Sequence, residues 1–111
     1  MEECIFCKII NKEIPSNIVY EDDEVLAFKD INPQAPVHII AIPKKHVSSV
    51  METKKTIIAD IFDAIQKIAK EQGIDKSGFR VITNCGKDAG QTVNHLHFHI
   101  LAGANLGEKI V

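Results

Sequence analysis

Apolar and histidine residues alternate strictly along residues 95–99 of the chain. A period of two is typical of a β-strand, in which successive side chains point to opposite faces. We therefore expect the imidazoles of His95, His97 and His99 to share one face of a strand, while the apolar residues between them pack into a core on the other face.

Four further segments have the β-branched and apolar character of strands, namely residues 18–20, 25–28, 38–42 and 79–83. The first two are separated by a short charged turn and should form a hairpin. The third is almost continuously apolar and lies between Pro36 and Pro43, which indicates a central strand buried on both faces.

Two segments show helical periodicity instead. Residues 4–11 form a short amphipathic pattern. In residues 55–72, apolar side chains recur at steps of one, three and four, which predicts a long helix with a single apolar stripe. Gly73 is predicted to end this helix, and Thr53 or Thr56 is predicted to cap its start.

The predicted order is a helix, three strands, a long helix and two strands. Short loops between consecutive strands favour antiparallel pairing. We therefore expect an α+β fold in one domain spanning Met1–Val111, with a five-stranded antiparallel sheet, one long helix and a short N-terminal helix. The long helix should cover one face of the sheet, so the histidines need the other face or an open edge.

Composition and charge limit the partners of the chain. The formal net charge is −2, so no basic surface is expected to bind nucleic acid. No apolar run approaches the roughly 18 residues of a membrane helix. The start, Met1-Glu2-Glu3, lacks the basic region of a signal peptide, and we expect a cytoplasmic protein.

The three cysteines argue against a disulfide framework, because their number is odd. Cys4 and Cys7 form a C-x-x-C pair, which suggests half of a metal site or two reduced thiols.

A row of three imidazoles allows two kinds of chemistry. One ring could attack a substrate while a neighbour transfers a proton, since histidine titrates near cellular pH. His38, at the start of its own strand, could bring a fourth ring. Alternatively, three neutral imidazoles and a water could form a catalytic zinc site. The spacing alone leaves both open.

The alternating histidines follow the sequence Gly90-Gln91-Thr92, and together these motifs resemble the histidine triad (HIT) superfamily of nucleotide hydrolases and transferases. The opening is similar to the Hint branch of that superfamily, and so are several later motifs in register. These motifs are IFCKII at 5–10, EIP at 13–15, PQAP at 33–36 and IPKKH at 42–46. The similarity covers nearly all of residues 4–102.

The resemblance implies a homodimer that binds a purine nucleotide such as AMP. It also implies hydrolysis of adenosine or other purine nucleoside 5′-phosphoramidates to AMP and an amine, through a nucleotidyl-histidine intermediate. Two alternatives remain. The sister branch of dinucleoside polyphosphate hydrolases shares the Gly-Gln-Thr motif, and a nucleotide-binding adaptor could hydrolyse only incidentally. The match across residues 5–15 favours the Hint branch.

Carried over by position, the nucleophile implied is His97, whose other ring nitrogen a backbone carbonyl could hold. His99 and His38 correspond to residues beside the phosphate and leaving group, and His95 to a structural or proton-relay position. The nucleotide-binding residues implied are Asp30 for the ribose, an apolar base slot and a group near the phosphate. The residues implied for the slot are Phe6, Ile9, Phe28 and Ile31, and those near the phosphate are Asn84 and Thr92. Gln91 and Val93 complete the nucleotide-binding set.

Several microbial members of the family hold a structural zinc ion through this C-x-x-C pair and two histidines. The resemblance therefore implies a zinc site made by Cys4, Cys7, His46 and His95. No cofactor is expected to take part in the reaction itself. The C-terminal residues 104–111 lack the tryptophan-containing ending of animal Hint proteins, which leaves the natural amine open.

Overall fold

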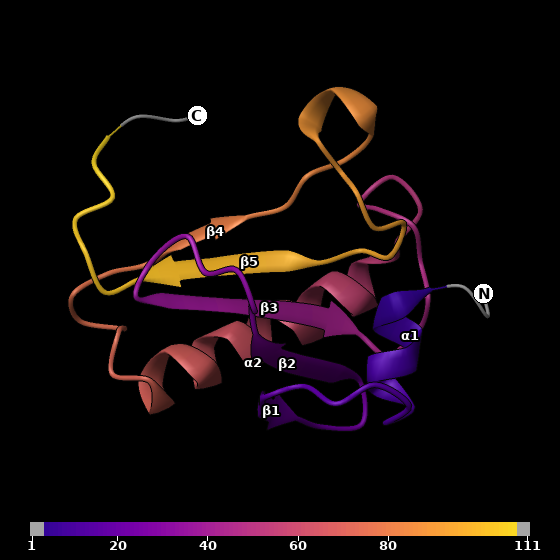
Figure 1. Ribbon diagram of the computed structural model, residues 1–111, viewed down its shortest axis with the longest axis horizontal. Helices are drawn as coiled ribbons and strands as arrows, with labels where there is room; N and C mark the ends of the chain where they lie inside the picture. The colour runs from indigo at the N-terminus through magenta and orange to yellow at the C-terminus, as the bar shows by residue number, and fades with distance from the viewer. Residues whose placement is uncertain (1–3, 109–111) are drawn as a thin grey trace.

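A computed structural model describes residues 4–108, so the ends of the chain at 1–3 and 109–111 lie outside the description. The part of the expected C-terminal tail at 109–111 is therefore not covered. The elements in chain order (Figure 1) are α1 Ile5–Ile10, β1 Ile18–Glu21, β2 Val25–Lys29, β3 Val37–Pro43, α2 Lys55–Glu71, β4 Arg80–Ile82, the 3-10 turn η1 Lys87–Ala89, and β5 Phe98–Ala102.

The five strands form one antiparallel sheet in the order β1-β2-β3-β5-β4. The predicted α+β fold is confirmed. β3 is the central strand, and β5 inserts between β3 and β4, so that His99 lies between Ile40 of β3 and Ile82 of β4. The strand that carries the end of the histidine row thus lies well inside the sheet.

The two helices pack against opposite faces of the sheet. Alternate residues of β2 and β3 separate into two cores because strand side chains alternate between faces. One core joins α2 to Val25, Ala27, Ile39 and Ala41. The other joins Phe6 and Ile9 of α1 to Leu26, Phe28, Ile40 and Ile42. The central strand is therefore buried on both faces, as its apolar sequence predicts.

The apolar stripe of α2 faces the sheet, and Gly73 ends the helix with a φ of 72°. The backbone amide of Gly73 donates to the carbonyl of Lys70, and that of Ile74 donates to the carbonyl of Ala69. This is the Schellman pattern that glycine permits. Within residues 4–108, no helix has the length and apolar character needed to cross a membrane.

The predicted threonine cap of α2 is wrong. The helix begins after Lys54, which makes no capping hydrogen bond with its side chain. Thr56 already lies inside the first turn, because the amides of Ile57 and Ile58 both donate to the Lys54 carbonyl. The start of this helix is therefore set without the side-chain oxygen that usually accepts there.

The histidine row begins before the strand. β5 starts at Phe98, not at His95, because the preceding backbone bonds to other segments. The amide of Leu96 donates to the carbonyl of Val47 at 2.7 Å, and Thr83 Oγ1 donates to the carbonyl of His97 at 2.7 Å. The alternation of faces still holds, since Leu96 and Phe98 pack in the core on the α2 side.

Candidate active site

The His97 ring is fixed by a hydrogen bond to the backbone two residues earlier. Its Nδ1–H donates to the carbonyl oxygen of His95 at 2.7 Å. A neutral imidazole carries one proton, so this bond leaves the lone pair of Nε2 available. No hydrogen bond between residues of the 4–108 range involves that Nε2. The ring is buried and contacts the edges of Phe6 and His99, with centroids 5.1 and 5.2 Å away.

A chain of hydrogen bonds also sets the tautomers of His38 and His99. The backbone amide of Gln34 donates to His38 Nδ1 at 3.0 Å, so neutral His38 carries its proton on Nε2. That Nε2–H donates to His99 Nδ1 at 2.9 Å. Neutral His99 therefore keeps its own proton on Nε2. The structure thus brings the fourth ring, His38, to the row. The sequence could not mark the backbone amide of Gln34 as its partner, because every non-proline residue has a backbone N–H.

Asp30 lies beside the same pair of histidines. Its Oδ2 is 3.3 Å from Nε2 of His38, and its Oδ1 accepts from the amide of Asn32 at 2.7 Å. Two lone pairs on each carboxylate oxygen leave room for further donors, such as ribose hydroxyls.

The expected base slot is only partly assembled. Phe6, Ile9, Phe28 and Val93 belong to one apolar cluster, in which the Phe6 and Phe28 rings meet edge to face at 5.6 Å. Ile31 is separate from it, with 93% of its surface exposed. It follows Asp30 in the loop before β3, where the apolar alternation that predicts burial is absent.

Gln91 ties three backbone segments together. Its Nε2 donates to the carbonyls of Ser48 at 2.7 Å and Val93 at 3.0 Å, and its Oε1 accepts from the amide of Gly86 at 2.9 Å. Both protons of its amide nitrogen are therefore used within the chain. Gln91 holds the loop that carries Thr92, and its geometry is that of a clamp rather than of a free ligand-binding group.

Thr92 and Asn84, the residues expected near the phosphate, form no side-chain hydrogen bond with any residue of the described chain. Thr92 is exposed and Asn84 is half-buried. Asn84 follows Thr83, whose hydroxyl donates to the His97 carbonyl, so this segment runs beside the histidine row. Both polar groups remain available to a ligand.

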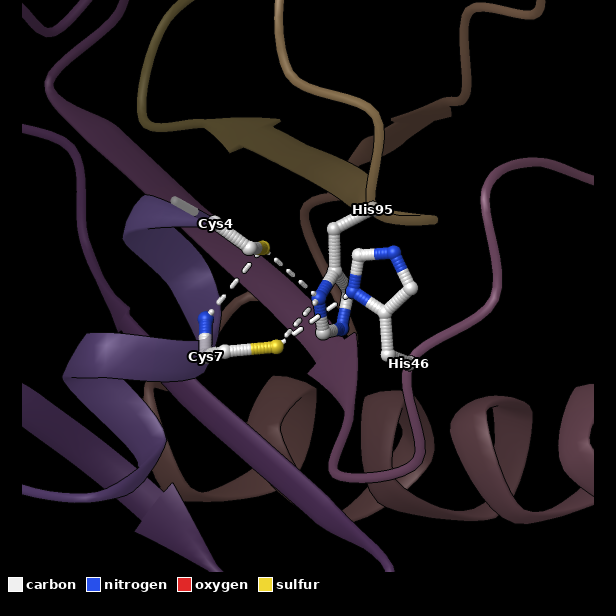
Figure 2. Close-up of side chains that lie close together, drawn as sticks. All are labelled: Cys4, Cys7, His46 and His95. Atoms are coloured by element: carbon white, nitrogen blue, oxygen red, sulfur yellow. Dashed lines mark hydrogen bonds between the residues drawn. The ribbon is translucent and has the colours of Figure 1, made fainter. Parts of the chain in front are cut away.

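Four side chains from three distant segments meet at one end of the sheet (Figure 2). Cys4 directly precedes α1 and Cys7 lies in it. His46 comes from the loop after β3, and His95 from the segment before β5. We call this group the thiol–imidazole cluster. The ligand atoms lie within 4.8 Å of one another. His95 Nδ1 is 3.3 Å from Cys4 Sγ and 3.6 Å from Cys7 Sγ, and His46 Nδ1 is 3.3 Å from Cys7 Sγ.

These separations suit tetrahedral zinc. With Zn–S near 2.3 Å and Zn–N near 2.0 Å, ligand atoms at tetrahedral angles lie roughly 3.3–3.8 Å apart. The tautomer of His95 fits as well, because its Nε2–H donates to the carbonyl of Pro43 at 2.8 Å and leaves the lone pair of Nδ1 facing the sulfurs.

Burial favours the uncharged forms of three groups in these two clusters, the rings of His95 and His99 and the thiol of Cys7. It lowers the pKa of His95 to about 4, and it also lowers the pKa of His99, with further contributions from the neighbouring His97 and His38. Burial and the adjacent Cys4 thiol raise the pKa of Cys7 to about 11. Neutral imidazoles are the forms that a nucleophile and a metal ligand both require.

Comparisons with known proteins agree with this architecture. The model of the HIT domain family matches residues 11–106. The purine nucleoside phosphoramidase of Escherichia coli K12 is 46% identical over an alignment of 112 positions, which covers 98% of this chain and 94% of that protein.

Two solved structures are similar as well. The HIT family hydrolase from Clostridium thermocellum is 53% identical, with a TM-score of 0.96 over 100% of this chain and 99% of that one. The histidine triad nucleotide-binding protein from Candida albicans is 36% identical, with a TM-score of 0.84 over 88% of this chain and 73% of that one.

The clamp geometry makes a prediction for Gln91→Ala. The substitution removes three hydrogen bonds and leaves the carbonyls of Ser48 and Val93 without this donor, so the free energy of unfolding should fall by about 1–3 kcal/mol. Urea denaturation measures the change. Gln34→Ala is the matched control, because the Gln34 side chain makes one exposed bond, to the carbonyl of Asn32, and should have little effect. Equal stability of the two variants would contradict the clamp.

Proposed function

This chain belongs to the histidine triad (HIT) family, in its Hint branch, and on that premise we propose that it is a purine nucleoside phosphoramidase. It cleaves the P–N bond of adenosine or other purine nucleoside 5′-phosphoramidates and releases AMP and an amine. The similarity to the phosphoramidase of Escherichia coli extends over almost the whole of both chains and supports this reaction.

The observation that carries the proposal is the tautomer of His97. With Nδ1–H held by the His95 carbonyl, Nε2 offers its lone pair to the α-phosphorus. In-line attack forms a P–N bond to His97 as the bond to the leaving nitrogen breaks. A covalent intermediate of this kind divides one difficult displacement into two easier steps.

The leaving nitrogen requires a proton, and His99 supplies it. The pKa of this ring is low in the free protein, but the negative charge of a bound phosphoramidate favours the protonated form. His99 gives the proton from Nε2 to the leaving nitrogen, and the neutral amine departs. The second proton of the charged ring lies on Nδ1, so the Nε2–H of His38 then turns from His99 to Oδ2 of Asp30, which is 3.3 Å away.

Water completes the reaction. His99, now neutral, takes a proton from the water that attacks phosphorus, and the bond to His97 breaks to give AMP. Asp30 accepts hydrogen bonds from the ribose hydroxyls, and the cluster around Phe6 and Phe28 packs against the base. Thr92, Asn84 and backbone amides donate hydrogen bonds to the phosphate. These donors stabilise its negative charge, so the reaction needs no metal ion for this purpose.

His97→Ala should abolish turnover of an adenosine phosphoramidate while AMP binding largely remains, because Asp30 and the apolar cluster are intact. The loss should reach several orders of magnitude, as when other enzymes lose a catalytic nucleophile. Rapid quench of the unchanged protein with labelled substrate should trap an acid-labile, base-stable adduct on histidine. Asn94→Ala, at an exposed neighbour, is the control. Near-normal turnover by His97→Ala would disprove the assignment.

The same assay decides between related functions. Steady-state rates with an adenosine phosphoramidate and with a diadenosine polyphosphate are compared on one preparation. Faster hydrolysis of the polyphosphate would favour the sister branch of the family. Tight AMP binding with negligible turnover of both would favour an adaptor.

The thiol–imidazole cluster is proposed to hold one structural zinc ion. Two thiolates and two neutral imidazoles form a closed tetrahedral set with no open position for substrate. Binding would favour the thiolates over the protonated thiols, against the raised pKa of Cys7. The bound ion would join α1 to the histidine row and would take no direct part in the reaction.

Protein purified without chelator should therefore contain one zinc ion per chain by elemental analysis. Cys7→Ser should lower the zinc content, whereas Cys85→Ser should not, since Cys85 is exposed and outside the cluster. Absence of zinc, together with Cys4 and Cys7 thiols that titrate freely in the native protein, would rule out the site.

The chain is also proposed to form a homodimer. β4 is an edge strand of the sheet. Val81 on this strand and Phe79 next to it each expose about one-third of their surface, and Phe62 on α2 exposes nearly half. A hollow of about 700 Å³, lined in part by Phe79 and Leu106, borders the same edge. A second copy would cover these apolar side chains. Light scattering at micromolar concentration should give twice the chain mass, and a 12.3 kDa species alone would exclude the dimer.

A further inference from the structure

We infer that Cys4 and Cys7 are positioning residues for the nucleophile: the thiol–imidazole cluster sets the orientation of the His97 ring through His95 and Phe6. The consequence for catalysis rests on the proposed function of His97. The structural coupling itself rests on contacts between the cluster and that ring, and it can be tested separately.

The first connection runs through His95. Its side chain is completely buried and is held at both nitrogens, with Nε2–H on the Pro43 carbonyl and Nδ1 against the two sulfurs. The backbone carbonyl of this same residue accepts the Nδ1–H of His97. A residue anchored at both ring nitrogens has little freedom to turn its backbone, so the cluster fixes the direction of the carbonyl that holds His97.

The second connection runs through Phe6, which lies between the two cysteines in α1. Its ring meets His95 and His97 edge to face, with centroid distances of 5.9 and 5.1 Å. α1 has only six residues, and so short a helix is unstable without tertiary contacts. The cysteines bind α1 to the cluster, and α1 in turn holds Phe6 against the ring of the nucleophile.

Both connections end on His97, which gives the cluster a role beyond stability. In-line attack requires Nε2 to point at phosphorus, and a displacement of about 1 Å can reduce a rate by about 100-fold. Loss of the thiols should loosen the start of α1, shift Phe6 against the His97 ring and loosen the His95 carbonyl, although Phe6 and Ile9 still pack α1 on the sheet. The nucleophile would then sample orientations that do not react.

The test compares Cys4→Ser and Cys7→Ser with Cys85→Ser, the same substitution at a cysteine outside the cluster. In protein labelled with nitrogen-15 at histidine, NMR should detect the Nδ1–H of His97 as a slowly exchanging proton, because the ring is buried and this proton is hydrogen-bonded. Single turnover of an adenosine phosphoramidate gives the rate of attack, and AMP titration gives affinity. We expect the two cluster variants to lose the Nδ1–H signal and to slow attack by about 10- to 100-fold, whereas Cys85→Ser keeps both.

A purely structural role predicts something else. The cluster variants would then unfold at lower temperature, but their folded molecules would keep the His97 signal and the unchanged rate of attack, and this result would overturn the inference. If the variants do not fold, zinc is removed from the unchanged protein with a chelator, and removal is verified by elemental analysis. Persistence of the His97 signal after complete removal would also overturn the inference.

The two proposals fail in different ways. If the unchanged protein neither turns over the phosphoramidate nor forms a histidine adduct, the proposed function is wrong. The NMR comparison of the cluster variants with Cys85→Ser then still decides whether the cluster positions His97.

Discussion

The hydrogen bond from His97 Nδ1 to the carbonyl of His95 is the constraint on which the rest of the site depends. It decides which nitrogen of the buried ring keeps a lone pair, and therefore which chemistry the ring can perform. The bond is short-range in sequence, but its acceptor is held by long-range contacts. His95 is anchored to Pro43 and to the thiols of Cys4 and Cys7, so three segments far apart in the chain determine one tautomer.

The two faces of the sheet contribute differently to the free energy of folding. On the α2 face, the strands bury apolar side chains that favour folding. On the other face, imidazoles lie beside the apolar cluster that includes Phe6 and Phe28. Burying polar rings is costly unless their nitrogens find partners. The carbonyl of Pro43 and the amide of Gln34 provide such partners, and burial then keeps His95 neutral.

Local patterns in the sequence determined most of the fold. The alternation along residues 95–99 predicted which side chains share a face, and the structure places Leu96 and Phe98 in the α2-side core. The apolar run at 38–42 predicted the central strand, and the helical stripe ending at Gly73 predicted α2. These predictions succeed because side-chain periodicity directly reflects which face of an element is buried. Family motifs, rather than periodicity, supplied the expected roles of the site residues.

Only the tertiary structure decided how these elements meet. The sequence by itself determined the order of the elements and which faces they bury. It did not show that β5 starts at Phe98, that Gln91 clamps three segments, or that Ile31 lies outside the apolar cluster. The physical reason is common to the first two: their hydrogen-bond partners are backbone groups, which every residue type offers alike and which only folding brings within reach. The position of Ile31 follows from the path of its loop, where no periodic pattern indicates a buried side.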